Sequence, residues 1–379
     1  MNELRKSEHS LGWPLMVAAN HADASHFVFP SGLRPRFLLP VDKSVAKVGL
    51  EFFLSPLKRL ALNYQAFTAR LSAATRSSKL VETGNMKEIK EMLSEPGLQT
   101  VVALGTPGPY TKHTVLLLSQ ALIPLAIAKV GTTRAAAALI ANEADWLTNL
   151  AAEGGLSTTI PRLIASRQTG ETYTLVQSLS GGKQLSYAFT GMHLTFLSSL
   201  QGHEERGSAF TASEMRRQME RRMTGLEMKL SQEWRRRAKR AIHELDKRLG
   251  GERLPTVVAH RDFVPWNIHL SGSGLFVFDW EYASHGYLPL YDLFHFLLMP
   301  VALKRNISQN RLRKLIRETV TIGLQLNSGK QKTLAADAQL LAYLTDLCLF
   351  YLESNDGDDT DDIVVQRYAH SIDVLLEDH

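Results

Sequence analysis

The sequence predicts an α+β fold with two lobes, in which a small antiparallel sheet precedes a larger and mainly helical part. Three observations predict this fold. Short apolar runs between turn residues, which are typical of strands, fill residues 96–180. Apolar residues recur at steps of three and four over residues 214–249, which predicts one or two amphipathic helices. A cluster of polar residues at set separations follows at residues 260–281.

Residues 1–95 are expected to form an accessory amino-terminal extension of unknown role. Turn residues at 30–36 precede a short apolar run at 37–39, which predicts a strand. Residues 56–74, in which Leu and Phe recur at helical spacing, predict a helix, and residues 86–93 predict a shorter one.

A strand, a loop and a second strand are expected next. Apolar residues at 100–104 and 115–118 flank a turn-rich loop at 105–112. The loop contains Gly105 and Gly108, but it lacks a Gly-x-Gly-x-x-Gly spacing, and its two prolines make it stiff. It is therefore read either as a phosphate-covering loop or as an ordinary hairpin turn.

The following segment predicts a strand and a helix that each carry one charged residue of interest. Residues 125–131 form an apolar run with a single lysine, Lys129. Good helix formers fill residues 134–150, which include Glu143. Fourteen positions separate Lys129 from Glu143, which leaves room for a short loop and two to three helical turns.

A hinge is expected near residue 180. Residues 174–179 read as a strand, and Ser-Gly-Gly at 180–182 breaks the pattern. We therefore predict a first lobe at residues 96–180 and a helical lobe at residues 181–379.

Residues 214–249 are a strongly basic segment. They hold twelve Lys or Arg and six Asp or Glu, a net charge of +6 against +5 for the whole chain. These charges either form a solvated helix face or bind an anionic substrate or an anionic membrane surface. Nucleic acid is the weakest interpretation, because no nucleic-acid-reading module accompanies the charge. An acidic run at 356–362 lacks EF-hand spacing and predicts a solvated loop.

The most informative segment is residues 260–267, His-Arg-Asp-Phe-Val-Pro-Trp-Asn, followed by Phe-Asp-Trp-Glu at 278–281. Asp262 precedes Asn267 by five positions, and Asn267 precedes Asp279 by twelve. Phosphoryl transfer from ATP needs one carboxylate to receive the proton of the attacking hydroxyl, and an amide and a second carboxylate to hold Mg²⁺ against the phosphates. The kinase catalytic loop has this spacing, so we assign catalysis to Asp262, Asn267 and Asp279, and metal binding to the last two.

This segment resembles the aminoglycoside phosphotransferase and choline kinase group, the small-molecule branch of the protein-kinase-like fold. Enzymes of that group carry His-Gly-Asp, then Asn five residues after the Asp, then Ile-Asp-Trp-Glu or Ile-Asp-Phe-Glu. Asp-Trp-Glu-Tyr-Ala at 279–283 looks more like choline kinase relatives than like protein kinases, which have Asp-Phe-Gly. Arg261 departs from the small-molecule pattern and matches the protein-kinase one. The resemblance covers about residues 96–379 and implies ATP and Mg²⁺ as cofactors.

The resemblance also implies nucleotide-binding partners upstream, and they occur in the expected order. Lys129 would hold the phosphates of ATP, and Glu143 would hold Lys129 in place. By itself Lys129 would be an ordinary solvated lysine, and Glu153 competes with Glu143 for the second role. Four further residues are assigned to nucleotide binding from their places in the loop and the hinge: Gly105, Gly108, Gln177 and Leu179.

Three residues near the polar motif receive supporting roles. His260 is expected to be a structural hydrogen-bonding residue and not a catalyst. Glu281 either touches the metal or positions Asp279. Asp292 matches a position that, in the resembling family, braces the catalytic loop.

The bulk properties are those of a globular protein. With 379 residues, of which 44% are hydrophobic and 21% charged, the chain has room for two or three folding units. A single cysteine, Cys348, excludes an internal disulfide and a multi-cysteine metal site, and its apolar neighbours predict a buried thiol. The sequence shows no signal-peptide pattern and no apolar run of eighteen residues, so a cytoplasmic location is expected.

Together these features predict an ATP-dependent phosphotransferase that moves the γ-phosphate to a hydroxyl of a small molecule, with Asp262 as the base. The resemblance implies sugars, amino sugars or amino alcohols as acceptors. Aminoglycosides are polycations that usually bind acidic pockets. The acidic residues after 350 could supply such a pocket, but the basic segment could not, so a neutral or anionic sugar or a lipid-linked acceptor is at least as plausible as an aminoglycoside. Tyr282, Tyr287 and Trp266 could form an aromatic wall for a quaternary ammonium group.

Two alternatives stay open. The chain could bind nucleotide as a scaffold or regulator without transferring phosphate, which the irregular loop at 105–112 and the unassigned extension favour. It could also be a protein kinase, which Arg261 favours but the absence of Asp-Phe-Gly and Ala-Pro-Glu segments opposes.

Overall fold

The computed structural model of the chain contains two compact units, which divide between residues 181 and 182. The described residues are 15–18, 25–29, 35–54, 79–152, 156, 158–184, 187–200, 208–251, 253–272, 274–304, 308–327, 336–360 and 362–377.

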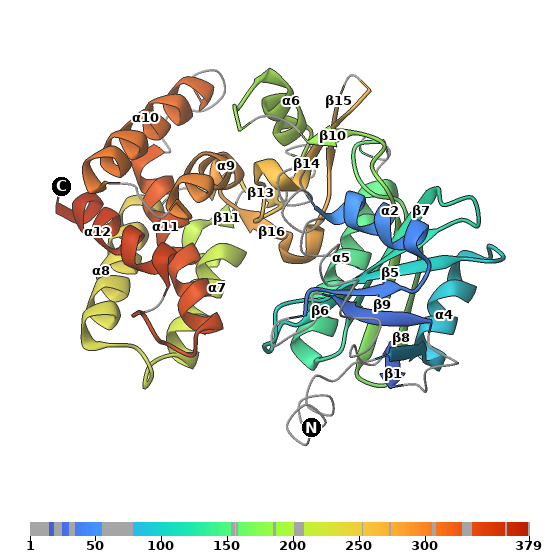
Figure 1. Cartoon of the computed structure of the whole chain (residues 1–379). Helices are drawn as coiled ribbons and strands as arrows, with labels where there is room; N and C mark the ends of the chain where they lie inside the picture. Colours follow the sequence, from blue (N-terminus) through green and yellow to red (C-terminus); the bar gives the residue numbers. More distant parts are fainter. Residues whose placement is uncertain are drawn as a thin grey trace. The chain divides into compact units, whose positions relative to one another are not determined.

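An antiparallel sheet forms the body of the first unit (Figure 1). Its described strands follow the order β1-β4-β2-β3-β5-β6-β7-β9-β8. The strands are Met16–Ala18 (β1), His26–Phe29 (β2), Phe37–Pro40 (β3), Lys79–Glu82 (β4), Gln99–Ala103 (β5), Lys112–Leu118 (β6), Pro124–Gly131 (β7), Leu163–Thr169 (β8) and Thr172–Ser178 (β9). Because β3 pairs with β5, the described strands of residues 1–95 extend the same sheet.

The two faces of this sheet carry separate apolar cores. Three helices of the described residues accompany the sheet, namely α2 (Lys43–Phe53), α4 (Gly84–Leu93) and α5 (Arg134–Ala152). Val102 and Val115 belong to the core that includes α4, whereas Val101 and Leu116 belong to the core that includes α2. This alternation follows from the pleat of a strand, which directs successive side chains to opposite faces.

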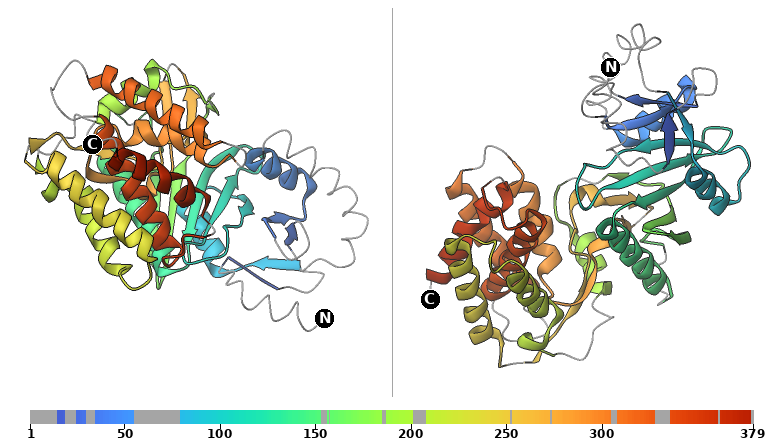
Figure 2. Two further views of the ribbon diagram at one scale, coloured as in Figure 1. Left: turned by 90° about the vertical axis from the view of Figure 1, so that its left-hand side faces the viewer. Right: turned by 90° about the horizontal axis from the view of Figure 1, so that it is seen from below.

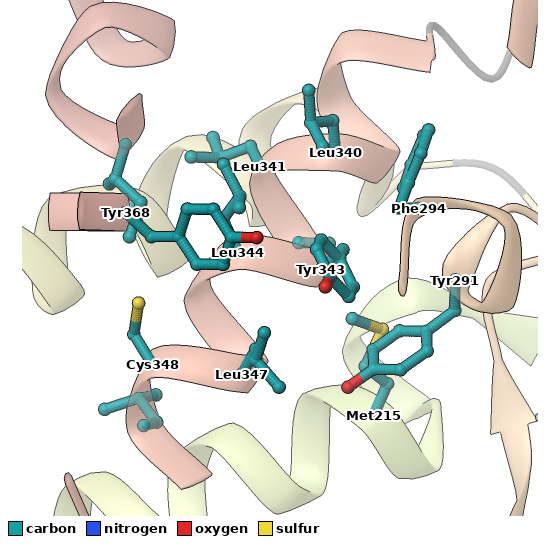
Figure 3. Packing of buried hydrophobic residues seen from close by; sticks show 14 of the residues in the cluster. Met215, Tyr291, Phe294, Leu340, Leu341, Tyr343, Leu344, Leu347, Cys348 and Tyr368 are labelled. Carbon is teal, nitrogen blue, oxygen red and sulfur yellow. The ribbon is translucent and has the colours of Figure 1, made fainter. Parts of the chain in front are cut away.

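Helices make up most of the second unit. They are Gly191–Leu200 (α6), Glu214–Gly225 (α7), Gln232–Leu249 (α8), Tyr291–Ala302 (α9), Gln309–Asn327 (α10), Ala336–Ser354 (α11) and Ile363–Glu377 (α12). Helix α11 packs against α7, α8 and α12, so the red and yellow helices lie side by side (Figure 2). Figure 3 shows Tyr343 and Leu347 of α11 in this core, near Tyr291 and Phe294 of α9.

Short strands in the second unit position the polar motif. They are Lys183–Gln184 (β10), Ser208–Ala209 (β11), Arg253–Leu254 (β12), Val257–Ala259 (β13), Ile268–Ser271 (β14), Gly274–Val277 (β15) and Ser284–Tyr287 (β16). Strand β13 pairs with β16, and β14 pairs with β15. Residues 260–267 therefore run from the first of these pairs to the second, and residues 278–283 run back. Both polar segments thus connect the β13–β16 pair with the β14–β15 pair, and they lie next to each other.

Many elements predicted from the sequence are confirmed. Strands β3, β5, β6, β7 and β9 and helices α4 and α5 lie where the apolar patterns predicted them. The basic segment 214–249 forms two helices, because Ser213 and Ser231 each accept a backbone N–H of the following turn and so start α7 and α8. The helix predicted at 56–74 lies outside the described residues, and α2 was not predicted.

Two bulk expectations concern the helices. Cys348 is buried on α11, as its neighbours predicted, and burial raises the pKa of its thiol. None of the described helices combines the length and the apolar character that crossing a membrane requires.

Candidate functional site

In the first unit, Lys129 and Glu143 form a buried ion pair. Lys129 Nζ donates to both carboxylate oxygens of Glu143 at 2.6 Å, and the two residues are 7% and 0% exposed. Strand β7 can approach α5 this closely because Gly131 ends the strand: a Cβ at Gly131 would lie 2.6 Å from the backbone of Ala136. The ammonium group of Lys129 is thus held in one place and excluded from bulk water. A firm contact between this group and phosphate oxygens requires both properties.

The loop between β5 and β6 is a tight hairpin connection. Gly105 allows close packing there, since a Cβ on it would lie 2.1 Å from the carbonyl oxygen of Lys112. The carbonyl of Gly108 accepts both the backbone N–H and the hydroxyl of Thr111, at 3.1 and 2.7 Å. The loop is therefore held by its own hydrogen bonds, and its placement over a nucleotide stays a prediction.

Gln177 and Leu179 share one face of the sheet with Lys129. Strand β9 pairs Gln177 with Ile127, so both side chains project to the same side, and Lys129 follows Ile127 by two residues. Gln177 is 4% exposed, and its amide oxygen has no hydrogen-bond partner among the described residues. The residues assigned to the hinge thus lie on the face that carries the lysine, although nothing in the unit tests their role.

In the second unit, Asp292 fixes the backbone of the loop 260–267. Its two carboxylate oxygens accept the backbone N–H groups of His260 and Arg261, at 2.8 and 2.9 Å. Burial raises the pKa of Asp292, and the two donated hydrogen bonds oppose that change. Asp292 lies in the first turn of α9, so the start of this helix braces the loop, as the resemblance implied.

His260 holds the loop from within. Its Nδ1 accepts the backbone N–H of Asp262 at 3.2 Å, and its Nε2 lies 3.1 Å from the carbonyl oxygen of Phe278. Burial lowers the pKa of His260, which favours the neutral ring with its proton on Nε2. His260 therefore links the two polar segments as a structural residue, in agreement with the sequence analysis.

Arg261 combines a left-handed backbone with a buried guanidinium group. Its φ is 66°, a conformation that glycine adopts without cost. The guanidinium group donates to the carbonyl of Tyr282 at 3.1 Å and lies 4.7 Å from the centre of the Tyr287 ring and 3.8 Å from a carboxylate oxygen of Asp346. Asp346 in turn accepts a hydrogen bond from Arg222 at 2.6 Å. These contacts explain how an arginine is tolerated where the resembling small-molecule kinases have glycine.

Asp262 is contacted at both carboxylate oxygens. Its Oδ2 accepts Asn267 Nδ2 at 2.8 Å, and its Oδ1 lies 3.3 Å from Nε2 of His295 on α9. His295 was not predicted from the sequence as a site residue. Its position three residues after Asp292 was the available signal, because this spacing places both side chains on one face of α9.

The hairpin of β14 and β15 brings Asn267 and Asp279 to the same end. The backbone N–H of Phe278 donates to the carbonyl of Asn267 at 3.1 Å, and Asp279 is the next residue. Asp279 is left-handed, with φ of 73°, a strained state that is found most often at functional sites. Because the Asn267 amide nitrogen donates to Asp262, its amide oxygen is the atom available to a cation. Glu281, which is buried, follows in the same turn.

A cavity of about 340 Å³ lies beside Asp262 in the second unit. Four of its lining residues are tyrosines or phenylalanine, and most of the others are charged or polar. The lining residues are Arg261, Asp262, Glu281, Tyr282, Tyr291, His295, Leu347, Phe350, Tyr351 and Ser354. This volume suits a small molecule. Of the three aromatic residues suggested for a cation wall, Tyr282 lines the cavity, Tyr287 is buried beneath Arg261, and Trp266 packs near Tyr187 instead.

Most arginines of the basic segment are neutralised by ion pairs. The pairs join Arg216 to Asp246, Arg217 and Arg221 to Glu214, Arg222 to Asp346, Arg237 to Asp373 and Arg248 to Glu244. Arg236, Lys239 and Arg240 are exposed and form no ion pair with the described residues. Lys229 and Ser231 contact Asp356 and Asp359 of the acidic run. These pairs favour the solvated-face interpretation and leave a smaller basic surface on α8.

A family model described as the phosphotransferase enzyme family, APH, matches residues 122–319. No curated protein sequence matches the chain. A thermostable mutant of aminoglycoside phosphotransferase APH(4)-Ia, in ternary complex with ADP and hygromycin B, is similar with a TM-score of 0.52 and 12% identity, covering 78% of this chain and 98% of its own. The apo form of a thermostable mutant of the same enzyme gives 0.50 and 11%, covering 76% and 98%.

Proposed function

Because the chain belongs to the phosphotransferase enzyme family and is a small-molecule phosphotransferase, we propose that it transfers the γ-phosphate of ATP to a hydroxyl group of its acceptor. The fold resemblance and the predicted kinase-like two-lobed α+β architecture are confirmed by the family match and the similar structures. The observation that carries the proposal is the hydrogen bond between Asp262 and Asn267, beside a cavity and one hairpin away from Asp279.

Asp262 is proposed as the base. Its carboxylate lines the cavity, and Asn267 holds one of its oxygens, so the group has a defined direction. A general base needs to lie within hydrogen-bond reach of the proton that it takes up, and an acceptor hydroxyl in this cavity would meet that condition. The proton of the acceptor hydroxyl would pass to Asp262 as the oxygen bonds to phosphorus and the bond to ADP breaks.

Asn267 and Asp279 are proposed to hold Mg²⁺. Both offer hard oxygen atoms, which Mg²⁺ prefers, and the two residues lie at one end of the β14–β15 hairpin. When bound, the ion would offset the negative charge that develops on the phosphate oxygens during transfer. Glu281 follows Asp279 in the same turn and is proposed to support it.

Nucleotide binding is proposed to use the first unit as well. Lys129, fixed by Glu143, would contact the α- and β-phosphates. Gly105 and Gly108 would lie near the phosphates, and Gln177 and Leu179 near the base. Support comes from the buried ion pair and from the shared face of the sheet that carries Lys129 and Gln177.

The acceptor is proposed to be a compact hydroxyl compound, such as a sugar, an amino sugar or an amino alcohol. The cavity supplies aromatic rings for an apolar face and only a few charged groups. The charged residues of its lining are Arg261, Asp262 and Glu281, one cation and two carboxylates, which suits a neutral acceptor or one with a single ammonium group.

Calorimetric titration of MgATP tests the nucleotide part of this proposal. We expect wild-type protein to bind MgATP and the Asp279→Ala variant to lose most of that binding, because a ligand of the metal is removed. Asp145→Ala, an exposed residue on α5, is the matched control and should bind as the wild type does. Absence of binding in the wild type would refute the proposal and favour a scaffold. An acceptor screen with labelled ATP would follow a positive result.

A further inference from the structure

One helical turn of α9 contacts both the backbone of residues 260–267, which we call the base loop, and the side chain of Asp262. Asp292 accepts two backbone N–H groups of the loop, and His295, three residues later, reaches the carboxylate of Asp262. His295 is 2% exposed and lines the cavity next to Asp262. A buried imidazole in this place must have its polar atoms satisfied, so its second nitrogen is informative.

That second nitrogen contacts Tyr343. The hydroxyl of Tyr343 lies 3.3 Å from Nδ1 of His295, and Tyr343 is completely buried on α11. Figure 3 shows Tyr343 in the helical core near Tyr291 and Phe294, whose rings pack against it. Burial raises the pKa of Tyr343 well above its usual value, so its hydroxyl keeps its proton and can donate it to Nδ1.

The tautomer of His295 follows from this contact. If Tyr343 donates to Nδ1, then the ring proton is on Nε2, and Nε2 donates to Oδ1 of Asp262. The carboxylate then receives one donor on each oxygen, from Asn267 at 2.8 Å and from His295 at 3.3 Å. Two donors on opposite oxygens oppose rotation of the carboxylate.

We propose that His295 is a positioning residue for phosphoryl transfer, which orients the carboxylate of Asp262 toward the acceptor hydroxyl, and that Tyr343 sets the tautomer in which His295 can do so. This inference rests on the proposed role of Asp262 as the base. The contacts from Tyr343 to His295 and from His295 to Asp262 connect the core of the helical unit to the wall of the cavity. The packing of α11 against α9 therefore sets the direction of the Asp262 carboxylate.

Steady-state hydrolysis of MgATP, with water as the acceptor, is the activity to measure, because it needs no identified substrate. His295→Met removes the donor to Asp262, and a small misplacement of a reacting group can cost about 10²-fold in rate. We expect kcat to fall by about 10-fold or more while KM for MgATP changes little. His295→Gln places an amide donor near the position of Nε2 and should recover most of kcat. Tyr343→Phe should give an intermediate loss.

Two controls separate positioning from folding. The double variant His295→Met with Tyr343→Phe leaves no orphaned hydroxyl in the core, so it should fold at least as well as His295→Met and show the same low kcat. His370→Met alters a histidine on α12 that contacts Arg313 and not the loop, and it should retain wild-type turnover.

The outcomes separate this inference from the proposed function. Wild-type turnover in His295→Met, or a kcat for His295→Gln as low as that of His295→Met, would overturn the role of His295 while leaving the base in place. No turnover in the wild type itself would overturn the proposed function and any catalytic role with it. A nitrogen NMR spectrum of histidine-labelled protein gives a readout without activity: a proton on Nδ1 instead of Nε2 of His295 would overturn the assigned tautomer.

Discussion

At the scale of single residues, the base loop shows how a few side chains set the direction of one carboxylate. Asn267 donates its amide nitrogen to Asp262, which leaves its oxygen for a cation. The same side chain thus connects the proposed base to the proposed metal ligand. A longer or shorter spacing between the two residues would break this link, which is a physical reason for the five-residue separation in the motif.

Replacing Asp262 by Asn tests the base at this scale. The variant keeps the size of the side chain but removes its ability to take up a proton, so turnover should fall by about 10²-fold or more. Binding of MgATP, measured by calorimetry, should stay close to the wild-type value. Asp358→Asn, an exposed substitution in the acidic loop, is the control. A large loss of MgATP affinity in Asp262→Asn would argue against its role as the base.

At the scale of elements, a buried ionic network ties three helices to the base loop. Asp346 on α11 accepts hydrogen bonds from Arg222 on α7, at 2.6 Å, and from the hydroxyl of Tyr291 on α9, at 2.9 Å. Arg261 of the loop lies 3.8 Å from the same carboxylate. One carboxylate without solvent contact therefore serves two guanidinium groups and fixes three elements relative to the loop.

Asp346→Asn should be strongly destabilising for this reason. The variant leaves two buried guanidinium groups without their shared charge, which typically costs about 3–5 kcal/mol of unfolding free energy. Urea unfolding followed by tryptophan fluorescence measures the change. Asp373→Asn is the matched comparison, because Asp373 pairs with Arg237 but is itself 32% exposed, so solvent screens the charge and the loss should be smaller, about 1 kcal/mol. Equal losses in the two variants would contradict the importance of burial.

At the scale of the whole molecule, both units contain buried histidines whose charging opposes folding. Burial lowers the pKa of His26 and His113 in the first unit and of His193 and His260 in the second. Each has an unfolded value near 6.5 and a lower folded value. The unfolded chain therefore binds more protons than the folded chain as the pH falls below 6.5.

The stability should consequently decrease with acidification. Above the unfolded pKa of 6.5 the histidines contribute no pH dependence, and below it each adds a slope of up to about 1.4 kcal/mol per pH unit until its folded pKa is reached. Urea unfolding at pH 7.5 and at pH 5.5 would measure the decrease. In His113→Gln, one titrating group is removed, so the slope should be smaller by about one proton. A stability that rises over this range would contradict the prediction.

Much of the fold was predictable because its signals are local. The strands at 100–131 and the helix that carries Glu143 follow from apolar runs, turn residues and helix formers within short windows. The addition of the described strands before residue 95 to the same sheet was not predicted. That arrangement depends on the pairing of β3 with β5, a contact between residues about sixty positions apart, which no local pattern records.

The sequence by itself determined the family, the proposed catalytic motif and most strands and helices around it, because the spacing of Asp262, Asn267 and Asp279 is a property of the chain alone. Only the tertiary structure decided which groups meet these residues. His295 reaches Asp262 because α9 begins beside the loop, and Asp346 meets Arg261 because α11 packs beneath it. Such contacts arise from the packing of elements far apart in the chain, whose side chains acquire a defined direction only when the core has formed.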